Sequence, residues 1–104
     1  MINRRNINHD TVYDIIEFEC ESNMQVIVDL LSQKYLVSII EKLEGPGTTI
    51  WYLNVSGEKI ALVNNFYGNF FRPINSDAAI FFEKEYDNLN QLIKVISHTP
   101  GQNL

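Results

Sequence analysis

The 104-residue chain lacks the features that hold a disulfide-linked fold together or anchor a protein in a membrane. Its single cysteine, Cys20, excludes an internal disulfide bond. No apolar run approaches the roughly 20 residues that a membrane helix needs, and no apolar stretch follows the arginines near the start, as it would in a signal peptide. We therefore expect a cytoplasmic protein that does not bind membranes.

Positive charge is also scarce, since eight Lys and Arg residues stand against thirteen Asp and Glu residues, a net charge of −5. The cations are scattered, which disfavours nucleic acid as a partner because phosphate backbones are bound by basic patches. The segment from Asp10 to Glu21 carries five acidic residues and no lysine or arginine. Such a local field accelerates association with a cationic protein, so the charge pattern favours a basic protein partner.

Catalytic and ligand-binding motifs are absent as well. The two histidines, His9 and His98, fall in the ends that we expect to be flexible, 1–10 and 98–104. The five glycines are typical of turns rather than of a phosphate-binding loop, and no spacing of His, Cys, Asp or Glu matches a metal-ligand pattern. We expect no cofactor and no metal, and predict that the protein is not an enzyme.

Length and hydrophobic periodicity predict a single α+β domain: a mainly antiparallel sheet of about six strands with two helices packed on one face. A capping box from Ser22 to Gln25 indicates the start of the first helix. Residues 78–97 also fit one long helix, but the alternation in "FFEKEY" favours a strand before the last helix. The predicted strands are 12–20, 35–43, 48–55, 59–66, a short one after Gly68, and 79–85; the predicted helices are 23–34 and 88–97.

An acidic row is expected on the first of these strands. Glu17, Glu19 and Glu21 alternate, so on a strand their side chains share one face at intervals of about 6.6–7 Å. The row fits a solvated sheet face kept soluble by charge. It also fits an acidic docking surface for a basic partner, and both interpretations remain open.

The most distinctive stretch is "NNFYGNFFRP" (64–73), which contains four aromatic residues and one arginine. A turn at Gly68 would direct Phe66 and Phe70 to one side of the sheet, and Tyr67 and Phe71 to the other. Core packing explains most of these rings, but helices on one face alone would leave some of them exposed, as in interaction hot spots. The candidate protein-binding residues are Glu17, Glu19, Glu21, Trp51, Tyr67 and Arg72.

The run "IWYLNVSGEKIALVNNFYGNFFRP" (50–73) resembles the strand–turn–strand core of small bacterial domains without an assigned activity. In size, charge and α+β layout the chain is similar to the immunity proteins of bacterial toxin–immunity systems, which are short acidic inhibitors. The resemblance implies an inhibitor that binds a basic toxin. The alternatives are a homodimer formed through the aromatic sheet face or an edge strand, and a small-ligand-binding protein.

Overall fold

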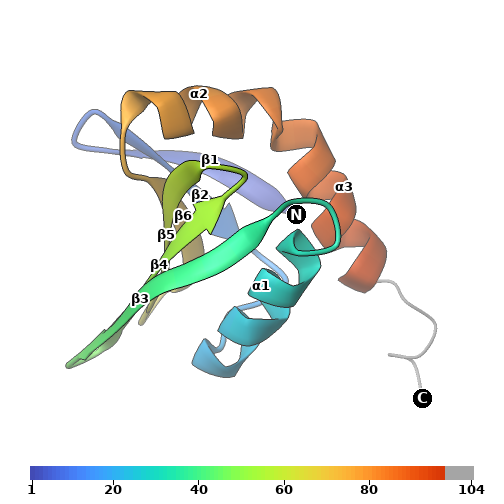
Figure 1. Cartoon of the computed structure of the whole chain (residues 1–104). Helices are drawn as coiled ribbons and strands as arrows, with labels where there is room; N and C mark the ends of the chain where they lie inside the picture. The colour runs from blue at the N-terminus through green and yellow to red at the C-terminus, as the bar shows by residue number, and fades with distance from the viewer. Residues whose placement is uncertain (98–104) are drawn as a thin grey trace, which may run out of the picture.

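The computed structural model describes residues 1–97 and shows one antiparallel sheet of six strands together with three helices (Figure 1). The strand order is β1-β2-β6-β5-β4-β3. The predicted α+β class is confirmed, whereas the predicted flexible end 98–104 lies outside the described residues. The elements are β1 (Ile2–Ile7), β2 (Asp10–Ile15), a single 3-10 turn η1 (Glu21–Asn23), α1 (Met24–Leu31), β3 (Val37–Gly45), β4 (Thr48–Val55), β5 (Glu58–Asn65), β6 (Gly68–Pro73), α2 (Ser76–Lys84) and α3 (Tyr86–Ser97).

The central strands β3, β4 and β5 confirm the predicted segments 35–43, 48–55 and 59–66 to within two residues at each end. The geometry of the β4–β5 turn explains why this hairpin could be predicted from the sequence. Ser56 and Gly57 both take positive φ, which matches the twist of a tight hairpin, and the Asn54 side chain accepts a hydrogen bond from Gly57 N at 2.8 Å.

The amino-terminal residues form a strand, so the prediction of a flexible end over 1–10 is wrong. β1 pairs with β2 along its whole length and forms one edge of the sheet. Asn8 and His9 make the tight turn between these strands, both with positive φ. Ile2 alone in β1 is buried, which is why the segment has no alternating apolar signal.

The strand predicted over 12–20 ends at Ile15, and residues 16–20 form a loop that leads to η1. The predicted helix 23–34 corresponds to η1 followed by α1. Its start does not use the predicted capping box, because the Asn23 side chain accepts a hydrogen bond from Cys20 N at 3.1 Å instead. Cys20 thus occupies the N-cap position that the sequence pattern assigned to Ser22, and Asn23 occupies the position that it assigned to Gln25.

The strand predicted over 79–85 is also wrong, because residues 76–97 form two helices that meet at Glu85. The Asn75 side chain caps α2 by accepting a hydrogen bond from Ala78 N at 2.8 Å. Ala78 and Phe82 are both buried and lie one helical turn apart. The alternation in "FFEKEY" therefore reflects a helix with a narrow apolar face, and the structure has three helices rather than two.

One hydrophobic cluster joins the helices to a single face of the sheet. Its helical members include Ile27 of α1, Phe82 of α2 and Leu89 of α3. The strand register puts all its sheet residues on the same face, with Tyr13, Phe71 and Leu62 in one row. The sheet residues of this core are Ile2, Tyr13, Ile15, Leu53, Val55, Ile60, Leu62 and Phe71.

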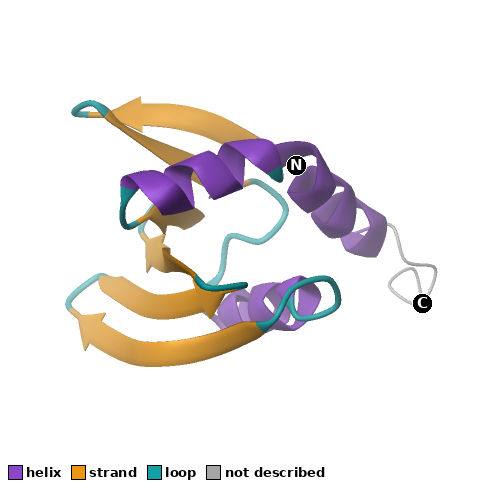
Figure 2. Ribbon diagram, turned by 45° about the horizontal axis from the view of Figure 1, so that its top comes forward, coloured by secondary structure: helices purple, strands orange, loops and turns teal. Residues whose placement is uncertain are grey.

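The opposite sheet face, called the outer face below, contributes nothing to that cluster. The sheet bends strongly between the β1–β2 hairpin and the β3–β4 hairpin, which lie at the top and bottom of Figure 2. In Figure 1, α2 lies above the strands, α3 lies to their right, and α1 lies below and to the right of β3. No helix in residues 1–97 has the length and apolar character to cross a membrane.

Candidate protein-binding surface

The turn between β5 and β6 carries two large aromatic side chains in water. Phe66 and Tyr67 are 93% and 87% exposed, and their rings pack edge to face with centroids 5.6 Å apart. Hairpin turns normally use glycine, asparagine or aspartate at these positions. We call these two residues the hairpin tip. Neither ring packs against the hydrophobic core.

The backbone of the turn is held by neighbouring polar and glycine residues rather than by the rings. The Asn65 side chain accepts a hydrogen bond from Tyr67 N at 2.9 Å. Gly68 has a φ of +117°, a conformation that favours glycine, and a Cβ there would come within 3.7 Å of Glu19 Cα. The turn therefore does not depend on the aromatic side chains for its shape.

Two asparagine amides fasten the 16–20 loop beside the hairpin tip. Buried Asn69 donates to the carbonyl oxygens of Phe18 and Cys20, both at 2.9 Å. Asn64 donates to the carbonyl of Glu19 at 3.1 Å and to the Asn69 side chain at 3.1 Å. These bonds place Glu19 next to the tip.

A groove of about 350 Å³ opens where the loop meets the tip, and exposed Ile16 lies in its wall. The Arg5 guanidinium in the groove is bound by Asp14 through two hydrogen bonds of 2.7 and 2.9 Å, so its charge is compensated. Glu19 has no cation within 4 Å among residues 1–97, which leaves the groove acidic. The lining residues are Arg5, Asp14, Ile15, Ile16, Glu19, Tyr67 and Asn69.

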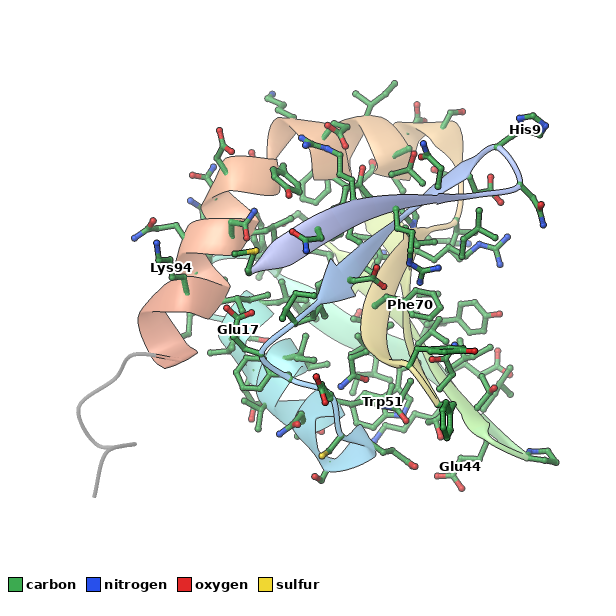
Figure 3. All side chains as sticks on the ribbon, turned by 180° about the vertical axis from the view of Figure 1, so that it is seen from behind. His9, Glu17, Glu44, Trp51, Phe70 and Lys94 are labelled. Atoms are coloured by element: carbon green, nitrogen blue, oxygen red, sulfur yellow. The ribbon has the colours of Figure 1, made fainter. Side chains whose placement is uncertain are left out.

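The expected row of glutamates does not exist, because β2 ends before it. Glu17 forms an ion pair with the amino group of Met1, and Glu21 begins η1. Figure 3 shows Glu17 on the α3 side of the molecule, well away from Trp51 and Glu44. Only Glu19 of the three predicted acids lines the groove with Tyr67.

Trp51 and Arg72 also lie apart from the hairpin tip. Trp51 packs against the core face, and Lys42 Nζ sits 4.1 Å from the centre of its ring. Arg72 lies on the outer face and pairs with Asp10 at 3.2 Å. Of the six predicted residues, the structure thus brings together Glu19 and Tyr67.

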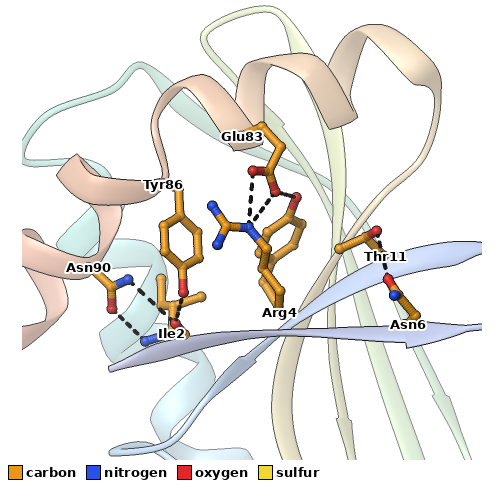
Figure 4. A network of polar contacts seen from close by, with 8 residues as sticks. Ile2, Arg4, Asn6, Thr11, Glu83, Tyr86 and Asn90 are labelled. Atoms are coloured by element: carbon orange, nitrogen blue, oxygen red, sulfur yellow. Dashed lines mark hydrogen bonds and ion pairs between the residues drawn. The ribbon is translucent and has the colours of Figure 1, made fainter.

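A second hollow, of about 640 Å³, lies between the β1–β2 hairpin and α2, and includes Arg4, His9 and Glu83. Three of its polar groups, those of Arg4, Tyr13 and Glu83, are engaged with one another (Figure 4). Arg4 Nε donates to both oxygens of Glu83, at 3.0 and 2.8 Å, and the Tyr13 hydroxyl donates to the same carboxylate at 2.5 Å. The Arg4 guanidinium also stacks 3.7 Å from the centre of the Tyr86 ring.

These contacts shift the acidities of Tyr13 and Glu83 in opposite directions. Burial, followed by the hydrogen bond to Glu83, raises the pKa of Tyr13 well above its ordinary value. The hydrogen bonds from Arg4 and then Tyr13 lower the pKa of Glu83. Tyr13 therefore stays protonated and Glu83 stays ionised, which suits a structural network between β1, β2 and α2.

No three His, Cys, Asp or Glu side chains within the described residues are grouped so as to hold a metal ion. No protein-family model matches the chain, and neither does any curated protein or solved structure. The geometry of the surface itself therefore carries the interpretation, and the hairpin tip with Glu19 is one feature that the packing of the domain leaves unexplained.

Proposed function

We propose that the protein is a non-enzymatic binding module that inserts its hairpin tip into the surface of a basic protein. The exposed ring pair of Phe66 and Tyr67 beside Glu19 carries this proposal. Aromatic rings bury about 150–250 Å² each when they are covered, at about 25 cal/mol per Å². Two rings held outside the core therefore offer a partner several kcal/mol of gross burial energy, at no cost to the fold.

The charge around the tip favours a cationic partner. Glu19 in the groove has no Lys, Arg or His within 4 Å in the described part of the chain, and neither has Glu21 at the start of η1, whereas the nearby Arg5 is neutralised by Asp14. The whole chain carries a net charge of −5. A negative field of this kind steers a positive protein surface toward the tip and makes the association rate depend on salt.

In its more specific form, the proposal is that the chain is an immunity-type inhibitor of a basic toxin. Its support is the resemblance in size, charge and α+β layout, together with the acidic aromatic tip. A protein that binds nucleic acid needs a cationic surface, so an acidic wedge would suit a nuclease toxin as an inhibitor. The mutual engagement of Tyr13 and Glu83 supports a non-enzymatic role, because neither group is free to act as a general base.

Site-specific photo-crosslinking tests the location of binding. A benzoylphenylalanine residue at position 66 or 67, placed in cell extract, is expected to form adducts with a protein of pI above about 9. Leu36 is the matched control, because it is an 85% exposed apolar residue in the α1–β3 connection. Equal adducts from position 36, or adducts only with acidic proteins, would overturn the proposal.

Once crosslinking has identified the partner, binding kinetics with the purified partner test the contributions of the aromatic ring and of the acidic residues separately. Tyr67→Ala is expected to weaken affinity at least about tenfold, mainly through faster dissociation. The double reversal Glu19→Lys/Glu21→Lys is expected to slow association about tenfold and to flatten its salt dependence. Leu36→Ala should change neither rate. An association rate unchanged by the charge reversal would refute the electrostatic part.

A further inference from the structure

The outer face carries an apolar patch that shares no residue with the hairpin tip. Ile40 and Leu43 of β3 are 54% and 44% exposed, and Ile74 after β6 is exposed to a similar degree. Half-buried Tyr52 lies among them, and together they line a shallow hollow of about 400 Å³. Scattered apolar residues on a surface are ordinary, but a contiguous group of this kind marks an interaction site.

The charges of the outer face balance, in contrast to the acidic chain as a whole. By strand register this face carries three acids and three bases. Four of them are already paired with each other, Arg5 with Asp14 at 2.7 Å and Arg72 with Asp10 at 3.2 Å. The other two are Glu41 on β3 and Lys59 on β5, on either side of Tyr52.

Glu41 and Lys59 have no ion-pair partner within 4 Å among the residues that the structure describes, and both line the hollow. They have opposite signs and flank one apolar centre. Such a surface is complementary to itself, because a two-fold rotation about an axis near Tyr52 places each Lys59 opposite the Glu41 of the other copy. An acidic or a basic partner protein would match only one of the two charges.

The β3 edge of the sheet is protected against pairing with another strand. β3 contains a bulge between Ile39 and Glu41. The half of the strand that begins at the bulge carries the charged residues Glu41, Lys42 and Glu44. Bulges and charged side chains are the usual devices that prevent edge-to-edge association. Contact through the face is therefore favoured over extension of the sheet.

We propose that a second copy of the chain binds the outer face through a two-fold interface, in which Ile40, Leu43, Tyr52 and Ile74 form the centre and Glu41–Lys59 pairs form the sides. The hairpin tips lie at the end of the sheet and stay free in this arrangement, so the dimer presents two tips. The inference rests on the outer face alone and does not require the proposed function. Because the patch is small, the expected dissociation constant is about 1–100 µM.

Sedimentation equilibrium between about 1 and 500 µM measures the association directly. The wild type is expected to shift from one to two copies over this range. Leu43→Asp places a charge in the patch at a position that is already half exposed, and is expected to weaken association at least about tenfold. Leu36→Asp introduces the same charge elsewhere on the surface and should leave the equilibrium unchanged. A wild type that stays monomeric throughout overturns the inference.

Charge exchange tests the two-fold arrangement itself. Lys59→Glu alone opposes two glutamates at both ends of the interface, and Glu41→Lys alone opposes two lysines, so each should weaken association about fivefold or more. The double variant Lys59→Glu/Glu41→Lys restores both pairs and should recover the wild-type constant. Unfolding midpoints of each variant confirm that the fold is intact. A dimer that is insensitive to these changes and to Leu43→Asp would use another surface and would contradict the inference.

Discussion

The hairpin tip and the network at α2 both combine two aromatic rings with an acidic residue, with opposite results. The α2 network, formed by Arg4, Tyr13, Glu83 and Tyr86, joins two aromatic rings to an acid and a base, and each member contacts another. The tip joins two rings to Glu19, and neither the rings nor the carboxylate contacts a complementary group elsewhere in the described chain. The presence of two rings and an acidic residue thus does not separate the two regions. The difference lies in whether the partners are supplied by the chain itself.

This comparison predicts that rings at α2 stabilise the fold and that rings at the tip do not. Phe82 is buried, and its centroid lies 4.4 Å from that of Tyr13 and 5.2 Å from that of Phe71. Phe82→Ala should lower the free energy of unfolding by about 3–5 kcal/mol. The double variant Phe66→Ala/Tyr67→Ala should change it by less than about 0.5 kcal/mol.

Urea denaturation followed by circular dichroism measures both changes. Similar slopes against denaturant concentration are needed for the comparison, since a change in slope indicates an altered denatured state. A loss of more than about 1 kcal/mol in the tip variant would mean that its rings support the fold, and the contrast between the two regions would then disappear.

The second prediction concerns the link between the loop and the tip. Asn69→Ala removes two hydrogen bonds to the carbonyls of Phe18 and Cys20 at a buried position, and should cost about 1–3 kcal/mol. It should also increase amide hydrogen exchange in residues 16–20 and displace Glu19 from the tip. Asn64→Ala gives a graded comparison, because this half-buried amide binds the same loop through one carbonyl, that of Glu19, and should cost only about 0.5–1 kcal/mol with a smaller increase in exchange. Unchanged exchange in Asn69→Ala would show that the loop is held by other contacts.

The strands β3 to β5 could be predicted from the sequence because their signals are local. β-Branched residues alternate there, and Gly47 and Gly57 mark turns with positive φ. β1 could not be predicted, because its one buried residue, Ile2, is bound by groups distant in the sequence. Asn90 Oδ1 accepts a hydrogen bond from Ile2 N at 2.6 Å, and the Tyr86 hydroxyl donates to Ile2 O. No window of residues around Ile2 contains that information.

The candidate site was predicted only in part, for the same reason. Tyr67 and Glu19 were both candidates, but Glu19 was predicted to lie on a strand that in fact ends at Ile15. The residues that bring Glu19 to Tyr67 are Asn64 and Asn69, whose side chains reach the loop across about fifty residues of sequence. The only available signal was the density of asparagines in "NNFYGN", which indicates side chains that bind backbone.

The smallest expected effect on stability distinguishes the carboxylate of Glu83, which Arg4 and Tyr13 contact, from the carboxylate of Glu19, which no cation contacts. Arg4 and Tyr13 lower the pKa of Glu83 below the ordinary glutamate value of about 4.3, so the ionised form stabilises the fold at neutral pH. That contribution is lost as the pH falls through the lowered pKa. Glu83→Gln should therefore cost about 1 kcal/mol at pH near 7, and its difference from the wild type should shrink as the pH falls through the lowered pKa.

Denaturation curves of the wild type and of Glu83→Gln across this pH range provide the measurement. Glu19→Gln is the control, because it removes a carboxylate that no cation contacts, and should change stability at neutral pH by less than about 0.5 kcal/mol. If Glu83→Gln costs as much in acid as at neutral pH, the ionised carboxylate does not stabilise the α2 network. The Glu83 side chain would then contribute only through packing, and the carboxylates of the two regions would no longer differ in their effect on stability.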